Sequence, residues 1–79
     1  MYSIKRVRPL QNYQVELVFN TDEVFIFDLK PYLEKGVFRS LKDQKNFKQV
    51  FVNPETKTLT WKNGIDFCAD SLHEKLLKV

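Results

Sequence analysis

Apolar and polar side chains alternate over residues 13–19. This two-residue period predicts a β-strand with one face on a core. After a polar turn, residues 24–27 are apolar on both faces and rich in β-forming residue types, which predicts the second arm of a hairpin. We expect the protein's own loops to cover the second face of this arm, and the alternative is that it meets another chain. A weaker alternation over residues 2–8, closed by Pro9, predicts an N-terminal edge strand.

The middle of the chain predicts short helices. Pro31 near a first helical position and Gly36 as a stop signal indicate one or two helical turns beginning near Asp28. The apolar spacing over residues 38–47 predicts another short helix or two linked turns. Asp28 and Asp43 stand where these segments would start, so we expect both carboxylates to cap helices.

Two further apolar stretches predict a second hairpin. Residues 50–52 and 59–61 would form its arms, with the polar loop 53–57 between them. The dipeptide Asn63-Gly64 is a strong signal for a tight turn. It leads into a short apolar arm over residues 65–68.

A terminal helix is expected to begin near Asp70. Ser71 and Glu74 match a capping box, in which the hydroxyl and the carboxylate each satisfy a backbone N–H at the helix start. Three apolar residues lie on one stripe of this helix: Leu72, Leu76 and Val79.

Together these elements predict an α+β fold: a small antiparallel sheet of two β-hairpins plus an N-terminal strand, short central helices and a C-terminal helix. No repeat or flexible linker divides the 79 residues, so we expect a single domain over residues 1–79. Such a domain buries only about 60% of its unfolded surface. Cys68 is the single cysteine, and no C-x-x-C pair or His cluster offers a zinc site. We therefore expect no cofactor or metal, and either a well-packed aromatic core or a homo-oligomer.

No segment approaches the roughly 18 consecutive apolar residues that span a bilayer. The basic N-terminal residues 1–10 lack the apolar run of a signal peptide. The single cysteine and the missing N-x-[ST] sequon agree with a reducing compartment. We therefore expect a cytoplasmic protein without a membrane partner.

The net charge of +3 comes from 13 basic and 10 acidic residues, and five of the basic ones lie within residues 34–48. On one continuous helix Lys45 and Lys48 would fall on the apolar side, so we do not expect a single basic helix. Two short helices would still present a basic patch to phosphates. Three N-terminal cations extend it: Lys5, Arg6 and Arg8. We favour a solvated face or an acidic protein partner, with nucleic acid as the alternative.

The only local cluster with metal-ligand or nucleophile chemistry comprises Asp66, Cys68, Asp70, His73 and Glu74. Nothing in it matches an established ligand or nucleophile spacing. We interpret Cys68 as a core residue and His73 as an exposed side chain near a helix end. No Gly-rich phosphate-binding loop is present in the sequence. We therefore expect no catalytic residues.

An ordered pattern covers most of the chain, from about Tyr13 to Leu72. It consists of four short motifs: D-L at 28–29, G-V-F at 36–38, L-x-D at 41–43 and W-x-N-G at 61–64. In this order it resembles the small bacterial family called domain of unknown function 2442. The resemblance implies a compact α+β domain of cytoplasmic proteins without an established activity. Members of that family occur with an added helix-turn-helix domain, or free-standing beside another small protein, similar to toxin–antitoxin pairs. This chain looks like the free-standing form.

We therefore expect a non-enzymatic protein–protein interaction module, one half of such a regulatory pair, whose partner is another small protein or a second copy. The alternative is a nucleic-acid-binding module that uses the basic residues 35–48, and a third is a small enzyme using Cys68 and His73. The expected interaction surface is Phe25, Phe27, Lys35, Arg39, Lys42, Lys45, Lys48 and Trp61. For Trp61 we favour core packing, although a Trp beside an Asn-Gly turn can also anchor an interface.

Overall fold

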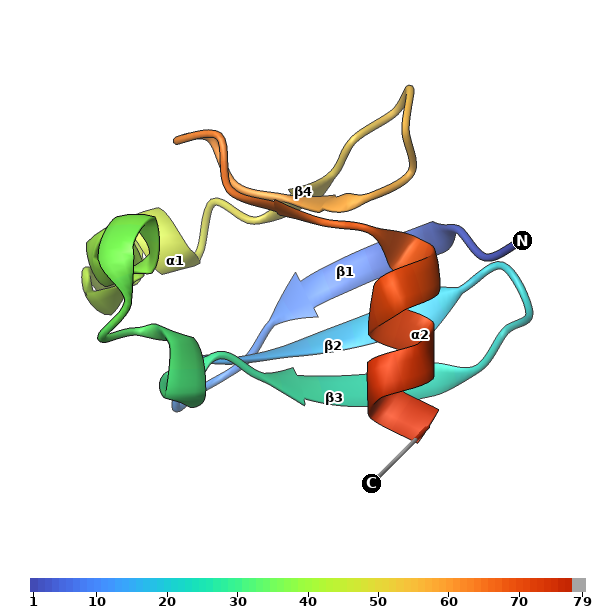
Figure 1. Cartoon of the computed structure of the whole chain (residues 1–79), viewed down its shortest axis with the longest axis horizontal. Helices are drawn as coiled ribbons and strands as arrows, with labels where there is room; N and C mark the ends of the chain where they lie inside the picture. The colour runs from blue at the N-terminus through green and yellow to red at the C-terminus, as the bar shows by residue number, and fades with distance from the viewer. Residues whose placement is uncertain (78–79) are drawn as a thin grey trace.

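In a computed structural model, which describes residues 1–77, two small antiparallel sheets and a terminal helix surround one core (Figure 1). The main sheet has the order β1 (Ile4–Pro9), β2 (Gln14–Phe19), β3 (Val24–Asp28). The small sheet has the order β4 (Phe51–Val52), β5 (Leu59–Thr60), β6 (Asp66–Phe67). In the sequence, three short helices connect the two sheets: η1 (Lys30–Tyr32), η2 (Gly36–Lys42) and α1 (Gln44–Phe47). The last element is α2 (Ala69–Leu77). The α+β fold is confirmed, with the strands divided between two sheets rather than joined in one.

Side-chain alternation decides which face of the main sheet is buried. Leu17 lies fully in the core, while its neighbours Glu16 and Val18 point to the opposite face, called here the outer face. Cross-strand pairing places Arg6 opposite Val18 and Arg8 opposite Glu16. A β-bulge between residues 4 and 6 interrupts the ladder near the start of β1.

The middle of the chain folds as two 3₁₀ helices and a single turn of α-helix. Gly36 has a φ of 42°, which favours glycine, and η2 begins at this residue. The Asp43 carboxylate accepts the backbone N–H of Lys45 at 2.9 Å and caps α1. The Asp28 carboxylate accepts the N–H of Lys30, also at 2.9 Å, at the start of η1. Both acids therefore bind backbone groups at helix starts, as predicted.

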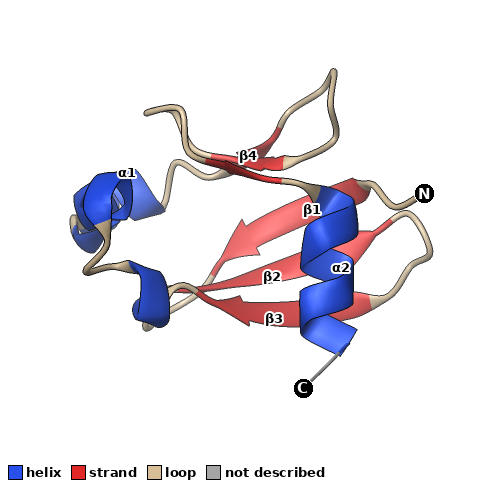
Figure 2. Ribbon diagram, in the orientation of Figure 1, coloured by secondary structure: helices blue, strands red, loops and turns tan. Residues whose placement is uncertain are grey.

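The small sheet is held by the predicted Asn63-Gly64 turn. Gly64 has a φ of 93° and its N–H donates to the carbonyl of Trp61 at 3.1 Å. The N–H of Trp61 in turn donates to the carbonyl of Ile65 at 2.8 Å. The small sheet lies beside β1, where the N–H of Ile4 donates to the carbonyl of Lys57 at 3.0 Å (Figure 2). The bulge on β1 and the missing N–H of Pro9 interrupt that edge, which explains why a second ladder does not join the two sheets.

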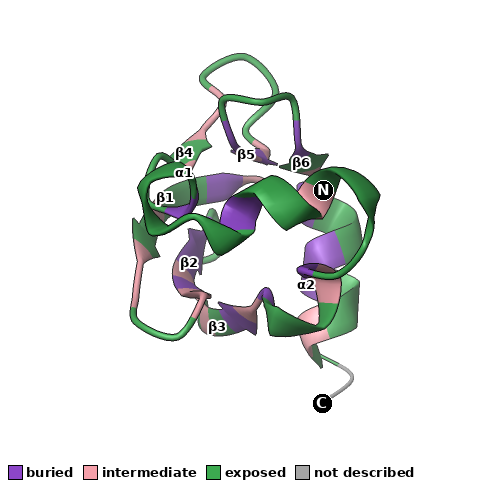
Figure 3. Cartoon of the chain, turned by 90° about the vertical axis from the view of Figure 1, so that its left-hand side faces the viewer, coloured by how far each residue is buried: buried purple, intermediate pink, exposed green. Residues whose placement is uncertain are grey.

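The helix α2 crosses the inner face of the main sheet, and both sheets and this helix contribute buried residues to one core (Figure 3). The carbonyl of Cys68 accepts the N–H of Leu72 at 3.0 Å, so Cys68 is the residue that precedes the first helical turn. The expected capping box is therefore wrong, because Ser71 already lies inside the helix. Val79, expected on the apolar stripe of this helix, lies outside the described residues. No helix within residues 1–77 is long and apolar enough to cross a membrane.

Candidate functional site

The aromatic side chains expected on the surface lie on the inner side of the protein. Phe27 is 3% exposed, and its ring packs edge-on against the ring of Phe67 in β6. Phe25 is half-buried on the same face, with its ring 5.6 Å from that of Phe19. Trp61 is 1% exposed, and its indole N–H donates to the carbonyl of Phe47 at 2.9 Å. The expectation of an exposed surface is therefore wrong for Phe27, because alternation directs its ring into the core. For Trp61 the favoured core packing is confirmed, so this residue does not belong to the expected exposed surface.

The opposite side of β3 is the one that faces solvent. Val24 is 57% exposed and Ile26 49%, on the outer face of the main sheet. The expectation that the protein's own loops cover this second face is wrong for these two residues. The sequence showed that β3 is apolar on both sides, but alternation alone did not tell which side α2 would cover.

The five cations of the predicted basic segment are all exposed: Lys35, Arg39, Lys42, Lys45 and Lys48. They are distributed over η2, α1 and the adjoining residues. The segment therefore forms two short helices, as predicted, and not one continuous basic helix. Lys42 forms an ion pair of 2.5 Å with Glu34, whose pKa is lowered by that hydrogen bond and charge. Within residues 1–77, the other four form no ion pair, although the Lys35 ammonium lies 5.9 Å from the ring centre of Tyr32.

A groove runs along β1 on the side facing the small sheet. Three shallow hollows follow one another there. The first lies between residues 9–12 and Lys48, and the second, of about 660 Å³, lies between residues 5–8 and 50–52. The third lies between residues 3–5 and 52–57 and shares Lys5 and Val52 with the second. The first hollow adjoins the second where Pro9 follows Arg8, although they share no lining residue, and we call the three hollows together the β1 groove.

Five cations border the β1 groove: Lys5, Arg6, Arg8, Lys48 and Lys57. Lys5 pairs with Asp22 at 2.7 Å, and this hydrogen bond and charge lower the pKa of Asp22. Arg8 pairs with Glu16 at 3.2 Å. Arg6 forms no ion pair with any residue from 1 to 77. The groove therefore carries more positive charge than its two carboxylates balance.

An aromatic side chain lies in the middle of the same groove. Phe51 of β4 is 38% exposed and lines the central hollow with Arg6 and Arg8. Exposed aromatics beside cations form the platforms on which nucleic-acid bases stack. Sequence reasoning missed Phe51 and Lys57, because only folding brings the segment after α1 alongside β1. It did name Lys5, Arg6 and Arg8 as an extension of the basic patch.

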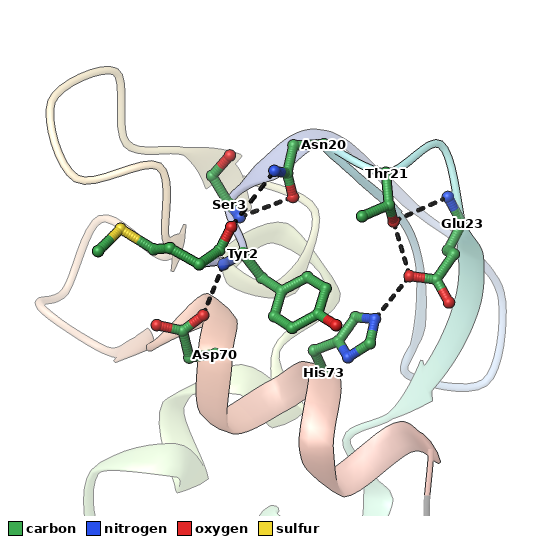
Figure 4. Close-up of polar contacts among 8 residues, drawn as sticks. Tyr2, Ser3, Asn20, Thr21, Glu23, Asp70 and His73 are labelled. Carbon is green, nitrogen blue, oxygen red and sulfur yellow. Dashed lines mark hydrogen bonds and ion pairs between the residues drawn. The ribbon is translucent and has the colours of Figure 1, made fainter.

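A second polar cluster joins the N-terminal segment to α2 (Figure 4). His73 is 2% exposed, and its Nε2 lies 2.6 Å from the carboxylate of Glu23. The ring of Tyr2 stacks on the imidazole at 3.5 Å between centroids. The N–H of Tyr2 donates to the carboxylate of Asp70 at 2.6 Å, and the hydroxyl of Thr21 donates to Glu23. Thr21 first and then His73 lower the pKa of Glu23.

The positions expected for Cys68 and His73 are reversed in the structure. Cys68 is exposed, and the backbone N–H groups of Ser71 and Asp70 lower the pKa of its thiol. His73 is buried and engaged with Glu23, and Cys68 and His73 share no hydrogen bond among the described residues. Within residues 1–77 no group of three potential ligands could hold a metal ion. The β1 groove is accordingly the surface whose chemistry most resembles a binding site.

A family model described as "Protein of unknown function (DUF2442)" matches residues 4–76. The chain belongs to the DUF2442 family. This confirms the resemblance that the ordered motifs indicated, and the model matches both β1 and nearly all of α2 as well. No curated protein matches the sequence.

A solved structure shares the fold. The crystal structure of Putative DNA Binding Protein NE0471 from Nitrosomonas europaea ATCC 19718 superposes with a TM-score of 0.71 at 20% sequence identity. The match covers 80% of this DUF2442 chain and 41% of NE0471. The chain therefore spans less than half the length of that protein, and at this identity the likeness concerns the fold alone.

Proposed function

We propose that this DUF2442 protein is a non-enzymatic binding module whose β1 groove binds the phosphate backbone of a nucleic acid. The observation that carries the proposal is the set of five cations bordering the groove, three of them on β1 and the other two, Lys48 and Lys57, on neighbouring segments. Two of them are each paired with a single carboxylate: Lys5 with the exposed Asp22, and Arg8 with the half-buried Glu16. Ion pairs of this kind contribute only about 0–1 kcal/mol, so both cations can exchange their carboxylate for a phosphate at little cost.

The dimensions and side chains of the groove favour a single strand. The six residues of β1 extend over about 20 Å, enough for several phosphates of an extended strand. Arg6, which has no ion pair within residues 1–77, lies beside Phe51 in the central hollow. A base that stacks on Phe51 would place its neighbouring phosphates near the cations, and stacking is available only to unpaired bases.

Two further observations support this choice. Lys48 belongs to both the groove and the basic segment, so the exposed Arg39 and Lys45 extend the positive charge beyond the end of β1. The name of the structural neighbour NE0471 describes it as DNA-binding, although more than half of that protein lies outside the match. The absence of an enzymatic activity stays a prediction.

The sequence favoured a protein partner over nucleic acid. Pairing with another small bacterial protein and a cytoplasmic location both stay predictions. The feature that supports a protein partner is the exposed outer side of β3, at Val24 and Ile26. It lies on the edge of the main sheet opposite the β1 groove.

Fluorescence anisotropy with labelled oligonucleotides of mixed sequence tests the proposal. We expect single strands to bind more tightly than duplexes of the same length, and the affinity to fall steeply with salt. Arg6→Gln should reduce the slope of log K against log salt by about 0.7. Phe51→Ala should weaken single-strand binding by about 1–3 kcal/mol and leave duplex binding nearly unchanged.

Lys62→Gln is the matched control, because it removes the same charge from an exposed residue outside the groove. If Arg6→Gln and Lys62→Gln reduce binding equally, the interaction depends on net charge and the groove is not the site. If no binding to single strands or duplexes is detectable at low salt, the nucleic-acid function itself is wrong.

A further inference from the structure

The strand β3 forms an open edge of the main sheet. The sheet has the order β1-β2-β3, and β3 pairs with β2 alone among the described strands. In Figure 1 β3 is the outermost strand, opposite to β1 and the small sheet. Val24 and Ile26 on this strand rank among the most exposed large apolar residues of the protein. An unpaired strand edge is a template for pairing with another chain.

The hydrogen bonds at both ends of β3 identify which backbone groups face outward. The N–H of Phe19 donates to the carbonyl of Glu23, and the N–H of Leu29 donates to the carbonyl of Tyr13, each at 2.9 Å. In an antiparallel ladder bonded residues alternate, so the odd-numbered residues of β3 bond to β2. The N–H and C=O groups of three residues consequently point to the free edge: Val24, Ile26 and Asp28.

The two edges of the main sheet differ in how they are protected. β1 has a bulge at Lys5, further cations at Arg6 and Arg8, and Pro9 at its end. These are the devices by which proteins prevent edge-to-edge pairing. β3 has the sequence V-F-I-F-D, without a lysine, a proline or a bulge within it. Only the edge at β3 is therefore ready to accept a strand.

We propose that β3 pairs antiparallel with β3 of a second copy of this chain and joins two main sheets into one sheet of six strands. A two-fold axis at Ile26 brings the outward backbone groups of the two strands together. Ile26 then lies opposite Ile26 of the second copy, and Val24 lies opposite Asp28. Each outward N–H finds an outward C=O, as an isologous interface requires.

The charges at the ends of β3 favour this register over the one shifted toward the start of the strand. With the axis at Ile26, Asp22 of one copy lies toward Lys30 of the other, and both side chains are exposed. Moving the axis by one residue, to Phe25, sets Asp22 against Asp28 and brings two acids together. Opposite charges across a strand pair stabilise it and like charges weaken it. The complementarity of the edge with itself is the reason for naming a second copy as the occupant, rather than an unrelated strand.

The proposal does not depend on the nucleic-acid function, because β1 and β3 are opposite edges. Analytical ultracentrifugation of the full chain, from micromolar to millimolar concentration, should show a monomer–dimer equilibrium. Ile26→Lys should raise the dissociation constant at least about tenfold, because the two-fold axis sets the new charges against each other. Val37→Lys is the matched control, since Val37 is an exposed apolar residue at 70% exposure on η2.

Two further variants test the backbone pairing itself. Ile26→Pro removes an N–H that faces the free edge and leaves the bonds between β2 and β3 intact, so it should abolish the dimer while circular dichroism stays native. In a Cys68→Ser background, Ile26→Cys should oxidise rapidly to a disulfide-linked dimer, because bonded pairs place the Cα atoms about 5.5 Å apart. Val24→Cys in the same background should not, since its counterpart in the second copy lies four residues away along the strand.

The proposal is overturned if the wild-type chain is monomeric throughout the concentration range. It is also overturned if a dimer forms that folded Ile26→Lys and Val37→Lys variants weaken equally, because the interface then lies elsewhere. Cross-linking of Val24→Cys as fast as Ile26→Cys refutes the register.

Discussion

Replacing Trp61 with Phe should remove a large share of the free energy of unfolding. Trp61 is 1% exposed, and its indole N–H donates to the carbonyl of Phe47, the last residue of α1, at 2.9 Å. A Phe leaves that carbonyl without this donor, which costs about 1–3 kcal/mol at a buried site. The smaller ring also leaves part of the indole volume unfilled. We expect this cavity to lower the free energy of unfolding by about 1–2 kcal/mol, since removing a whole aromatic side chain costs roughly 3–5 kcal/mol. The expected loss is thus about 2–5 kcal/mol, while a domain of 79 residues has roughly 4–12 kcal/mol in total.

The assay is urea unfolding followed by far-ultraviolet circular dichroism, because Trp61→Phe removes the only tryptophan and with it the fluorescence signal. Val37→Ala is the control: Val37 is 70% exposed, so its truncation should change stability by less than about 0.5 kcal/mol. If Trp61→Phe unfolds at the same urea concentration as Val37→Ala, the core position of Trp61 is refuted. A variant of unchanged stability that loses a binding partner would instead support an interface role for this residue.

Three other substitutions or reactions examine particular contacts. Hydrogen bonds from Thr21 and His73 lower the pKa of Glu23, so its carboxylate adds stability that is present above the ordinary Glu pKa of about 4.3 and is lost as the pH falls through the lowered value. The difference in Tm between wild type and Glu23→Gln should therefore shrink in acid, and a difference independent of pH would contradict this. The thiol of Cys68 is exposed and its pKa is lowered, so a disulfide reagent should label it fully in the native protein. The labelling rate should begin to rise at a pH below the ordinary Cys pKa of about 8.5. Labelling only after unfolding would show that the thiol is buried. Gly64→Ala should lower the free energy of unfolding in urea by about 1–2 kcal/mol, because the φ of Gly64 is 93°. An added Cβ meets nothing within 4 Å, so backbone strain is the only cause of this loss. A loss below about 0.5 kcal/mol would mean that the turn relaxes.

Local signals in the sequence were sufficient for most elements of the fold. Alternation over residues 13–19, the Asn63-Gly64 turn and the capping acids Asp28 and Asp43 each act over a few neighbouring residues. The structure has β2, the turn and the caps where these signals place them. The predicted capping box at Ser71 failed because the helix already begins at Ala69, where Cys68 accepts the N–H groups of Asp70 and Ser71. A thiol sulfur is a weaker acceptor than a hydroxyl and gives no recognised start signal.

The candidate site depended on contacts that no local pattern contains. Nothing near His73 in the sequence indicates that Tyr2 and Glu23 cover it, since these partners lie about seventy and fifty residues away. Phe51 likewise lies beside the cations of β1 only in the folded chain, because more than forty residues separate them in the sequence. Sequence reasoning could identify side chains suited to binding, but it could not tell which of them the core would take up.

The strand β3 shows how one apolar pattern serves two purposes. Phe25 and Phe27 contribute to the core, and the residues between them leave an apolar side facing solvent. If this edge pairs with a second copy, the resulting sheet has six strands, with a β1 groove at each outer edge. Five strand spacings separate the grooves, about 24 Å at 4.8 Å per spacing. A nucleic-acid strand long enough to reach both grooves would then bind with an affinity that neither groove provides alone. Each surface can nevertheless be disabled without touching the other, because β1 and β3 share only β2.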